Sequence, residues 1–403
     1  MRIFRFSCLD EIEKIMHDIG VDPYGVKIML PKSVSFLIHL KAISNIAANI
    51  IKQEMLSLGG DAALSKNALT GKTPKTDCLI ISTLNQLHDL TRKLRVQPFG
   101  LDKIANQLVE HVKNYGKNDF TLVLGKYSLK LSRRIHIMGI INLTPDSFSG
   151  DGLYAVNRSG YLKLALSKAE EMLKEGADII DLGGQSSRPG AKSITLKEEI
   201  LRTLPVVELL SKKINAPISI DTTRPEVAKA ALEAGAQMIN DISGLRNKRL
   251  VKLAAKSNAA VVVMHMLGRP VNMQKIIAYQ SLIDDISGYL KHAIEYAESS
   301  GINPSKIVID PGIGFGKRPE HNLEIIKKLA DFKVLGKPIL LGPSRKSFIS
   351  KSLGIGGQVR TLGTVATCVM AAERGAHILR VHDVREVSQA LRMVTAVTQN
   401  DNA

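Results

Sequence analysis

The segment PISIDTTRPEVAKAALEAGAQMINDI, residues 217–242, contains the pattern that decides the fold. Its two ends are short apolar runs, and the amphipathic stretch between them stops at Gly235. Short runs that are nearly all apolar are typical of strands covered on both faces, and a helix between two such strands connects them in parallel. The segment therefore predicts a strand–helix–strand unit of a parallel sheet.

The same unit recurs from about residue 133 onward. Apolar runs alternate with helical patterns, several of which end at a glycine such as Gly176 or Gly375. The runs cover residues 136–143, 178–184, 217–222, 238–242, 260–266, 307–312, 338–344 and 377–383. Eight strand–helix units make a (β/α)8 TIM barrel, which typically takes about 250 residues. The alternative is an open, doubly wound sheet, but no Gly-x-Gly-x-x-Gly turn follows the first run, so we predict the barrel over residues 133–403.

Residues 1–132 lack this rhythm and predict a separate, small α/β module. We expect a short helix over 10–20, a long helix over 33–60 and a strand over 76–82, then helices over 84–94 and 101–116. A hairpin around Gly125 and Lys126 should follow. The sequence assigns no catalytic group to this module. The fold class is thus α/β, a TIM barrel preceded by a small α/β domain.

The composition favours a small anionic substrate over nucleic acid. The 403 residues carry 55 Lys and Arg against 38 Asp and Glu, a net charge of +17, but no Trp and only 4% aromatic residues. Surfaces that bind single-stranded nucleic acid commonly stack bases on aromatic side chains. A basic surplus without such side chains suits a small anion better.

The cysteines and the pattern of apolar residues limit the cellular compartments in which the protein is expected. Cys8, Cys78 and Cys368 are odd in number and lack ligand-like spacing, which disfavours a disulfide framework and a structural zinc site. Each short apolar run near the N-terminus contains a charge, unlike a signal peptide. No stretch of about 18 apolar residues occurs. We expect a cytoplasmic protein that does not bind membranes.

Every apolar run of the predicted barrel ends in polar residues, and the carboxyl ends of barrel strands form the active face. Because side chains alternate along a strand, Arg380 and His382 should point to the same side. The polar residues are Asn142, Asp181, Gln185, Asp221, Asn240, Asp241, His265, Asp310, Ser344, Arg345, Lys346, Arg380 and His382.

These residues suggest two kinds of chemistry. Asp221, Asn240 and Asp310 offer acceptors suited to a flat heterocycle with several N–H donors, and Lys346 offers a donor to the same ring. Asn142, Arg380 and His382 resemble an anion clamp, since an arginine can fork two phosphate oxygens. For any one of them, a hydrogen bond within the barrel rim is the alternative interpretation.

Two loops carry further signals. Residues 142–152 form a long, polar, glycine-bearing segment, which is typical of a mobile active-site loop. The segment DPGIGFGK at 310–317 fails the Walker spacing, because Pro311 stands in place of the first Gly and Arg318 in place of the Ser or Thr. Its glycines more plausibly allow the backbone and Phe315 to approach a flat ligand.

Taken together, the loops resemble those of the dihydropteroate synthases. The resemblance spans about residues 133–398 and rests on INLTPDSFSGDG, LGGQSSRPGA, ISIDTT, NDISG, DPGIGFGK, GPSRKSFI and RVHDV in this order. It implies a transferase that joins 7,8-dihydropterin-6-ylmethyl diphosphate to 4-aminobenzoate, releasing pyrophosphate and making dihydropteroate for folate synthesis. It also implies Mg²⁺ as cofactor, an SN1-like path and a homodimer that packs through its last helices. The amino-terminal module is similar to an extension found on some family members.

The resemblance further implies roles for individual residues. The pterin would be held by Asp221, Asn240, Asp310 and Lys346, beside Phe315. The diphosphate would be held by Asn142, Arg380 and His382, with Mg²⁺ at Asn142 and Asp151. The aminobenzoate would be held by Ser187, Arg188, Lys346 and Ser347. The residues implied in catalysis are Asp221, Lys346, Arg380 and His382.

Two departures from the family pattern leave alternatives open. Gln185 replaces the usual acid of the Gly-Gly-Glu-Ser turn, and Gly150-Asp151 replaces the order Asp-Gly in the first loop. These changes keep a pterin-binding homologue without catalysis as one alternative. A methyltetrahydrofolate-dependent methyltransferase is another, but it leaves Arg380, His382 and the Ser-Arg-Lys run unexplained, and no Asp-x-His-x-x-Gly motif is present.

Overall fold

The structure is a computed structural model that describes residues 9–132, 134–144, 158–186, 193–270, 272–274, 277–354 and 360–399. It divides into two compact units, Met1–Lys113 and Asn114–Ala403. The boundary that we expected lies at 132/133, so the predicted hairpin falls in the second unit instead of the first.

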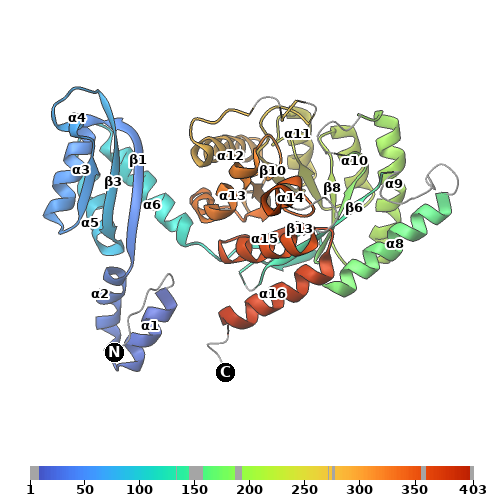
Figure 1. Cartoon of the computed structure of the whole chain (residues 1–403), viewed down its shortest axis with the longest axis horizontal. Coiled ribbons are helices and arrows are strands. Elements are labelled where there is room, and N and C mark those ends of the chain that lie inside the picture. The colour runs from blue at the N-terminus through green and yellow to red at the C-terminus, as the bar shows by residue number, and fades with distance from the viewer. Residues whose placement is uncertain are drawn as a thin grey trace. The chain divides into compact units, whose positions relative to one another are not determined.

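The first unit is built on a three-stranded antiparallel sheet of order β1-β3-β2 (Figure 1). Side chains of α3, α5 and α6 form its core with residues of β2 and β3, including Ile51, Met55, Ile80 and Leu90. The elements are α1 (Leu9–Asp18), α2 (Pro23–Ser33), β1 (Ser35–Ser44), α3 (Asn45–Ser57), β2 (Asp61–Leu64), α4 (Lys66–Leu69), β3 (Lys75–Thr83), α5 (Leu84–Leu94) and α6 (Leu101–Gly116).

The long helix predicted over 33–60 is wrong in its first half. Residues Ser35–Ser44 form strand β1, which pairs with β3, and the helix α3 begins only at Asn45. The Ser44 hydroxyl caps this helix by accepting a hydrogen bond from the Ala47 amide at 3.2 Å. Phe36, Ile38 and Leu40 alternate with more exposed residues, which is the pattern of a strand covered on one face.

The second unit is a closed barrel of parallel strands, as predicted. Among the described residues, its sheet has eight strands in the order β11-β10-β9-β8-β7-β6-β13-β12. A parallel bridge between Ile309 and Ile339 joins the two ends of that order and closes the ring. The strands are β6 (His136–Asn142), β7 (Ile179–Gly183), β8 (Ile218–Asp221), β9 (Met238–Asp241), β10 (Ala260–Met264), β11 (Ile307–Asp310), β12 (Leu340–Leu341) and β13 (Ile378–Val381).

Helices surround this ring (Figure 1). The predicted glycine stops are observed: Gly176, Gly235 and Gly375 have φ values of +112°, +112° and +94°, which favour glycine. The helices are α8 (Arg158–Glu175), α9 (Leu196–Lys213), α10 (Pro225–Glu233), α11 (Lys248–Lys256), α12 (Leu282–Ser299), α13 (Pro319–Lys327), α14 (Ser347–Leu353), α15 (Thr361–Glu373) and α16 (Val384–Gln399), with the 3-10 turns η1 (Pro304–Lys306) and η2 (Leu329–Leu335).

Alternate residues of the barrel strands belong to two separate cores. Residues such as Ile180, Ile220 and Val261 pack outward with the helices. Their neighbours Ile179 and Met238 belong instead to a second cluster that includes one residue or more from most of the strands. Period-two alternation thus separates a helix-facing layer from a layer inside the ring.

The hairpin of β4 (Thr121–Leu124) and β5 (Tyr127–Lys130) packs against this inner layer. Phe120, Leu122, Leu124 and Leu131 belong to the same cluster as Met138 and the other residues near the amino ends of the strands. This packing is the physical reason why the hairpin belongs with the barrel and the boundary falls before it. The amino-terminal end of the barrel is therefore covered by apolar side chains.

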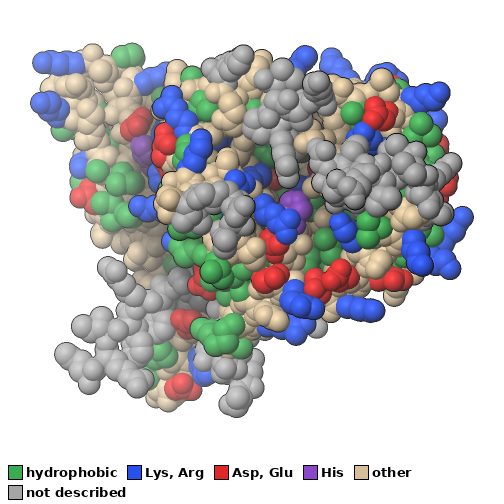
Figure 2. All heavy atoms as spheres, turned by 45° about the vertical axis from the view of Figure 1, so that its right-hand side comes forward, with side chains coloured by type: hydrophobic (Ala, Val, Ile, Leu, Met, Phe, Trp, Pro, Cys, Tyr) green, Lys and Arg blue, Asp and Glu red, His purple; other side chains and the backbone are tan. Residues whose placement is uncertain are grey.

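On the face that Figure 2 shows, Lys and Arg side chains are spread among acidic ones and do not form a single stripe. In the part of the chain that the structure describes, no helix is long and apolar enough to cross a membrane.

Candidate functional site

The alternation of side chains along the strands also determines which predicted site residues face the inside of the ring. On β7, Ile179 lies in the inner cluster, so Asp181 and Gly183 two and four residues later share its side. The same step leads from Met238 to Asn240. The other site residues that follow an inner-cluster residue by an even number of positions are Asn142, Asp310, Arg380 and His382.

The strand register sets several of these residues at one level. Asn142 pairs with Gly183, Gly183 with Asp221, and Asp221 with Asn240 as neighbouring Cα partners in successive parallel strands. Because Gly183 has no side chain, the space beside it stays open. A Cβ there would lie 3.6 Å from Asn142 Oδ1 and 3.8 Å from Asp221 Oδ2, so these two oxygens face the same space.

Arg380 is the centre of the charged cluster inside the ring. Its Nε donates to Asp181 Oδ2 at 2.7 Å, and its Nη2 donates to Asp221 Oδ2 at 2.7 Å. Asn240 Nδ2 donates to the same Asp181 oxygen at 3.2 Å. Nη1 makes no hydrogen bond to any residue that the structure describes. To fork two phosphate oxygens, Arg380 must therefore release one of its carboxylate partners, whereas Nη1 is already free of described partners and can donate to an anion.

Asn142 and His382 come together as expected of an anion clamp. Asn142 Nδ2 lies 3.2 Å from His382 Nε2. The other ring nitrogen, Nδ1, lies 3.0 Å from the hydroxyl of Ser344, which also accepts the His382 amide at 3.1 Å. The Ser344 contacts fix the orientation of the imidazole, so that Nε2 faces the barrel rim.

Asp310, Phe315 and Lys346 form the opposite side of the site. The Asp310 carboxylate accepts the Gly312 amide at 2.7 Å. Lys346 Nζ lies 4.4 Å from the centre of the Phe315 ring and donates to the Ile313 carbonyl. The loop after β11 thus places an aromatic ring and an ammonium group side by side.

Burial perturbs the protonation of the groups in this cluster. It raises the pKa of Asp221 to about 7, although the Arg380 charge opposes the shift. Burial also raises the pKa of Asp310, against the Lys346 charge. Burial lowers the pKa of Lys346 to about 8, against the Asp310 charge. Groups with perturbed pKa values that lie together in a recess are typical of functional sites.

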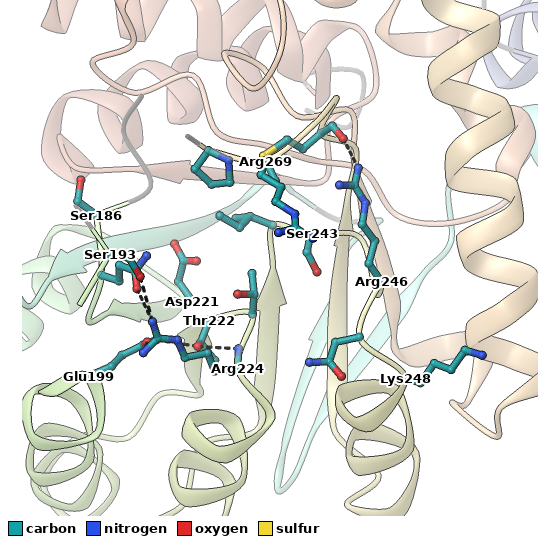
Figure 3. Close-up of a pocket in the computed structure, with 16 residues that line it drawn as sticks. Ser186, Ser193, Glu199, Asp221, Thr222, Arg224, Ser243, Arg246, Lys248 and Arg269 are labelled. Atoms are coloured by element: carbon teal, nitrogen blue, oxygen red, sulfur yellow. Dashed lines mark hydrogen bonds and ion pairs between the residues drawn. The ribbon is translucent and has the colours of Figure 1, made fainter. Parts of the chain in front are cut away.

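A cavity of about 690 Å³ opens beside this cluster. Figure 3 shows Asp221 and Thr222 on one side of it and Arg246 and Arg269 on another. Asp221 is the predicted site residue that both cavity and cluster share. The lining residues are Gln185, Ser186, Ser193, Glu199, Asp221, Thr222, Thr223, Arg224, Ile242, Ser243, Arg246, Asn247, Lys248, Met266, Arg269 and Pro270.

The resemblance implies Mg²⁺, and Asn142 is the described residue that would hold it. Mg²⁺ prefers oxygen ligands and commonly keeps several waters beside one or two protein groups and substrate phosphates. Asn142 Oδ1, which faces the open space at Gly183, is such an oxygen. The described residues contain no group of three or more His, Cys, Asp or Glu side chains arranged around a metal.

Three predicted residues lie outside the residues that the structure describes. They are Asp151, Ser187 and Arg188. Ser347, the fourth aminobenzoate position that we predicted along with Lys346, is exposed and begins helix α14.

Sequence reasoning assigned no role to several groups of the site. Asp181 is fully buried and binds Arg380, and its second oxygen, Oδ1, has no partner among the described residues. Lys317 is buried with its Nζ 2.9 Å from His265 Nδ1 and 3.1 Å from the Phe315 carbonyl. These contacts hold the turn that carries Phe315. Burial lowers the pKa of Lys317 well below its usual range and that of His265 to about 2.

A third such group lies below the cavity. Glu199 is buried, and Arg224 pairs with it at 3.2 Å between Nη1 and Oε2. No motif indicated this pair, because Glu199 lies on a helix face that resembles any amphipathic helix. The one signal in the sequence is that charged residues, Glu199 and Arg224, occupy positions that the fold covers.

Comparisons with known proteins agree with this architecture. A family model described as "Pterin binding enzyme" matches residues 138–382. The dihydropteroate synthase of Synechocystis sp. is 43% identical over 278 residues, which is 68% of this chain and 94% of that protein. A crystal structure of dihydropteroate synthase from Thermus thermophilus in complex with 4-aminobenzoate has a TM-score of 0.61 and 39% identity, and covers 69% of this chain and 99% of that one.

One relative extends over the first unit as well. The probable bifunctional folylpolyglutamate synthase/dihydropteroate synthase of Halobacterium salinarum is 35% identical over 399 residues, which is 98% of this chain and 47% of that protein. The first unit thus has a counterpart in another protein. On the strength of the matching family model and of these relatives, the chain belongs to the pterin-binding enzyme family and, within it, to the dihydropteroate synthases.

Proposed function

We propose that this chain condenses 7,8-dihydropterin-6-ylmethyl diphosphate with 4-aminobenzoate and that the residues of the barrel mouth hold the roles given below. The product is 7,8-dihydropteroate, a precursor in folate biosynthesis, and the second product is pyrophosphate. The convergence of Asp221, Lys346 and Arg380 at the carboxyl end of the barrel carries the proposal, with Arg380 donating to Asp221 at 2.7 Å and Lys346 beside the Phe315 ring. A solved relative is in complex with 4-aminobenzoate, which supports that substrate.

The pterin ring belongs among the buried acceptors of the cluster. Asp221, Asn240 and Asp310 present carboxylate and amide oxygens, and a pterin presents ring N–H and amino donors. A buried carboxylate costs several kcal/mol unless it is paired, so donors on the ligand stabilise these groups. Lys346 donates to the opposite edge of the ring, and Phe315 covers its face.

The diphosphate belongs at the Asn142 end of the cluster. His382 and Asn142 lie 3.2 Å apart there, and Arg380 Nη1 is available to an anion. The Asn142 amide oxygen, with Asp151 as its expected companion, would hold Mg²⁺. The ion, when bound, supplies positive charge to the departing diphosphate.

The reaction breaks one bond and makes another at the same methylene carbon. The C–O bond to the diphosphate breaks, and its electron pair leaves with pyrophosphate, which Arg380 and His382 stabilise. Positive charge spreads into the pterin, and the Asp221 carboxylate stabilises it. The amine nitrogen of the aminobenzoate then attacks the carbon and loses a proton. The neutral arylamine is already nucleophilic, so the step needs no strong base.

The aminobenzoate belongs above the pterin. Lys346 and Ser347 lie at the start of α14, and Ser187 and Arg188 follow β7 in the sequence. Arg188 would pair with the carboxylate of the substrate, and the serines would donate hydrogen bonds to it.

An assay with both substrates tests the proposal. Purified protein, Mg²⁺, pterin diphosphate and 4-aminobenzoate should give dihydropteroate, followed by mass. Lys346→Ala should lower kcat/KM by about a hundredfold, since the loss of one preorganised donor typically costs about 3 kcal/mol. Calorimetric binding of pterin diphosphate without any product would show a homologue that has lost catalysis. Unchanged activity of Lys346→Ala would refute the assigned role.

We also propose a homodimer that packs through the last helices. Leu362 and Met370 on α15 and Met393 and Val397 on α16 are exposed apolar side chains, with Leu362 76% exposed. Exposed apolar groups on adjacent helices favour burial against a second copy. Light scattering should give twice the chain mass, and Leu362→Lys should shift it toward the monomer.

A further inference from the structure

The turn between β11 and α13 carries Phe315 at the edge of the proposed pterin site. Residues 311–318 form neither helix nor strand, so no regular ladder of backbone hydrogen bonds fixes them. Their N–H and C=O groups need other partners, and side chains from several elements supply them. These partners decide where the Phe315 ring lies.

Lys317 is the buried group that holds the Phe315 backbone. The residue is 3% exposed, and its Nζ donates to the Phe315 carbonyl at 3.1 Å and lies 2.9 Å from His265 Nδ1. Burying an amine costs stability unless polar partners satisfy it, and these two contacts offset part of that cost. The amine is thus committed to Phe315 and His265.

His265 gives this tie a rigid anchor. It directly follows β10, and its ring packs edge-on against Tyr289 with the ring centroids 5.0 Å apart. Its backbone N–H donates to the Asp310 carbonyl at 2.9 Å. A Cβ on Gly312 would lie 1.9 Å from the His265 carbonyl oxygen, so only glycine fits and the turn packs directly on the end of β10. The anchor therefore belongs to the packed wall of the barrel.

Tyr279 holds the same turn at the next residue. Its hydroxyl donates to the Gly316 carbonyl at 2.8 Å. On the other side of Phe315, the Gly314 N–H donates to Asn322 Oδ1 at 2.7 Å. Phe315 is thus fixed at its own carbonyl and at both neighbouring residues.

The contacts of Lys346 show that this turn borders the site. Lys346 donates to the Ile313 carbonyl, and its Nζ lies 4.4 Å from the centre of the Phe315 ring. A Cβ on Gly314 would lie 2.9 Å from Lys346 Cδ, so the lysine stem runs against the turn. A displacement of the turn would therefore be felt at the site.

We propose that Lys317 is a positioning residue for pterin binding, because it holds Phe315 where the ring covers the pterin. The inference rests on the proposed function, in which Phe315 lies on the face of the pterin. A site that is ordered before its ligand arrives loses less conformational freedom on binding and binds more tightly. The charges of Lys317 and Asp310 also interact, so an electrostatic effect on Asp310 is the alternative that the test must exclude.

Calorimetric titration of the full-length chain with pterin diphosphate and Mg²⁺, without aminobenzoate, tests the role. In Lys317→Met the Kd for pterin diphosphate should rise about tenfold, since the buried Phe315 carbonyl loses its donor. The matched control is Lys306→Met. Lys306 is 7% exposed and donates to the Asn258 carbonyl, directly before the opposite end of β11, so its loss should leave the Kd unchanged.

Both substitutions are repeated in a Phe315→Ala background. If Lys317 acts through Phe315, Lys317→Met should then raise the Kd by less than about threefold, because two changes in one contact are not additive. A rise that stays about tenfold in this background would show that Lys317 acts through another group, such as Asp310 or Lys346, and would overturn the inference.

Hydrogen exchange of the protein without ligand measures the tie directly. The amide protons of Gly314 and Phe315 should exchange several-fold faster in Lys317→Met than in the parent and in Lys306→Met, because the turn opens more often. If Lys317→Met does not fold, Tyr279→Phe, which loses a single hydroxyl, takes its place, with a rise in Kd of about threefold expected.

The outcomes for the proposed function and for this inference are distinct. Failure of the parent to bind pterin diphosphate would refute the proposed function. Binding by the parent, with an unchanged Kd or an unchanged exchange rate in the variant, would overturn the inference alone.

Discussion

Asp181 is the residue that keeps Arg380 in place inside the barrel. It is fully buried, it accepts Arg380 Nε at 2.7 Å, and it also accepts Asn240. A guanidinium that has two carboxylate neighbours stays charged: burial acts to lower the pKa of Arg380, but Asp181 and Asp221 outweigh it and raise it. The direction in which Arg380 points therefore depends on Asp181.

Replacing Asp181 by Asn should damage catalysis more than stability. The variant keeps the shape but loses the charge that holds Arg380, so kcat/KM should fall on the order of a hundredfold. The control is Asp178→Asn, just before the other end of the same strand, where Asp178 pairs with Arg134 and lies 3.3 Å from His136. That variant should lower the unfolding midpoint and leave both KM values unchanged. Equal kinetic losses in the two variants would contradict the role of Asp181.

The activity should depend on pH in a bell-shaped manner. The Asp221 carboxylate is the active form, and its pKa is raised to about 7, so kcat/KM should fall as the pH drops through about 7. The Lys346 ammonium is the active form, and its pKa is lowered to about 8, so kcat/KM should fall again as the pH rises through about 8. Initial rates from about pH 5 to about pH 10 at subsaturating substrate measure both limbs.

The Lys346→Arg variant separates these limbs. An arginine stays charged over the whole range, so the alkaline limb should disappear while the acid limb stays. An alkaline limb that persists unchanged in this variant would assign it to another group.

At the scale of elements, the β4–β5 hairpin contributes to stability without touching the site. Leu122 is fully buried in the cluster at the amino ends of the barrel strands. Leu122→Ala should lower the free energy of unfolding by about 2–5 kcal/mol, as for other buried leucines. Denaturant unfolding measures this loss. The neighbouring Val123, 39% exposed on the opposite face, gives the control Val123→Ala, which should change it by less than about 1 kcal/mol.

The sequence predicts an element well when its pattern fits only one periodicity. The barrel strands are continuous apolar runs, and the same alternation that defines them places Asn240 and Arg380 inside the ring, so both fold and rim residues were predictable. Residues 35–44 were not, because Phe36, Leu40 and Ile43 fit helical spacing as well as Phe36, Ile38 and Leu40 fit a strand. Residues 35–44 form a strand and not a helix because they pair with β3. The local sequence pattern carries no information about this distant partner.

The contact between Glu199 and Arg224 could not be predicted from the sequence for a related reason. They lie 25 positions apart, on a helix and on a strand-to-helix turn, and only the closed barrel brings them within 3.2 Å. Likewise, Asp181 resembles any polar residue near a strand end until Arg380, on β13, is known to face it.

At the scale of the whole molecule, the two units predict different outcomes for two truncations. A chain that starts at Asn114 keeps the hairpin and the complete barrel, so it should fold and keep a KM for each substrate within about threefold of the parent. A chain that starts at Arg134 lacks Phe120, Leu122 and Leu124, exposes the amino end of the barrel and should unfold at a lower temperature or aggregate. Calorimetry and turnover of both chains measure this. Equal stability of the two would show that the hairpin is dispensable.

The hairpin at the amino end of the barrel has a consequence for the route by which substrates reach the site. The interior of the barrel is packed with side chains and the hairpin covers its amino end, so the proposed substrates reach the site only from the carboxyl end. In the placement that we propose, the pterin lies deeper than the aminobenzoate. We therefore expect an ordered mechanism in which pterin diphosphate binds before 4-aminobenzoate.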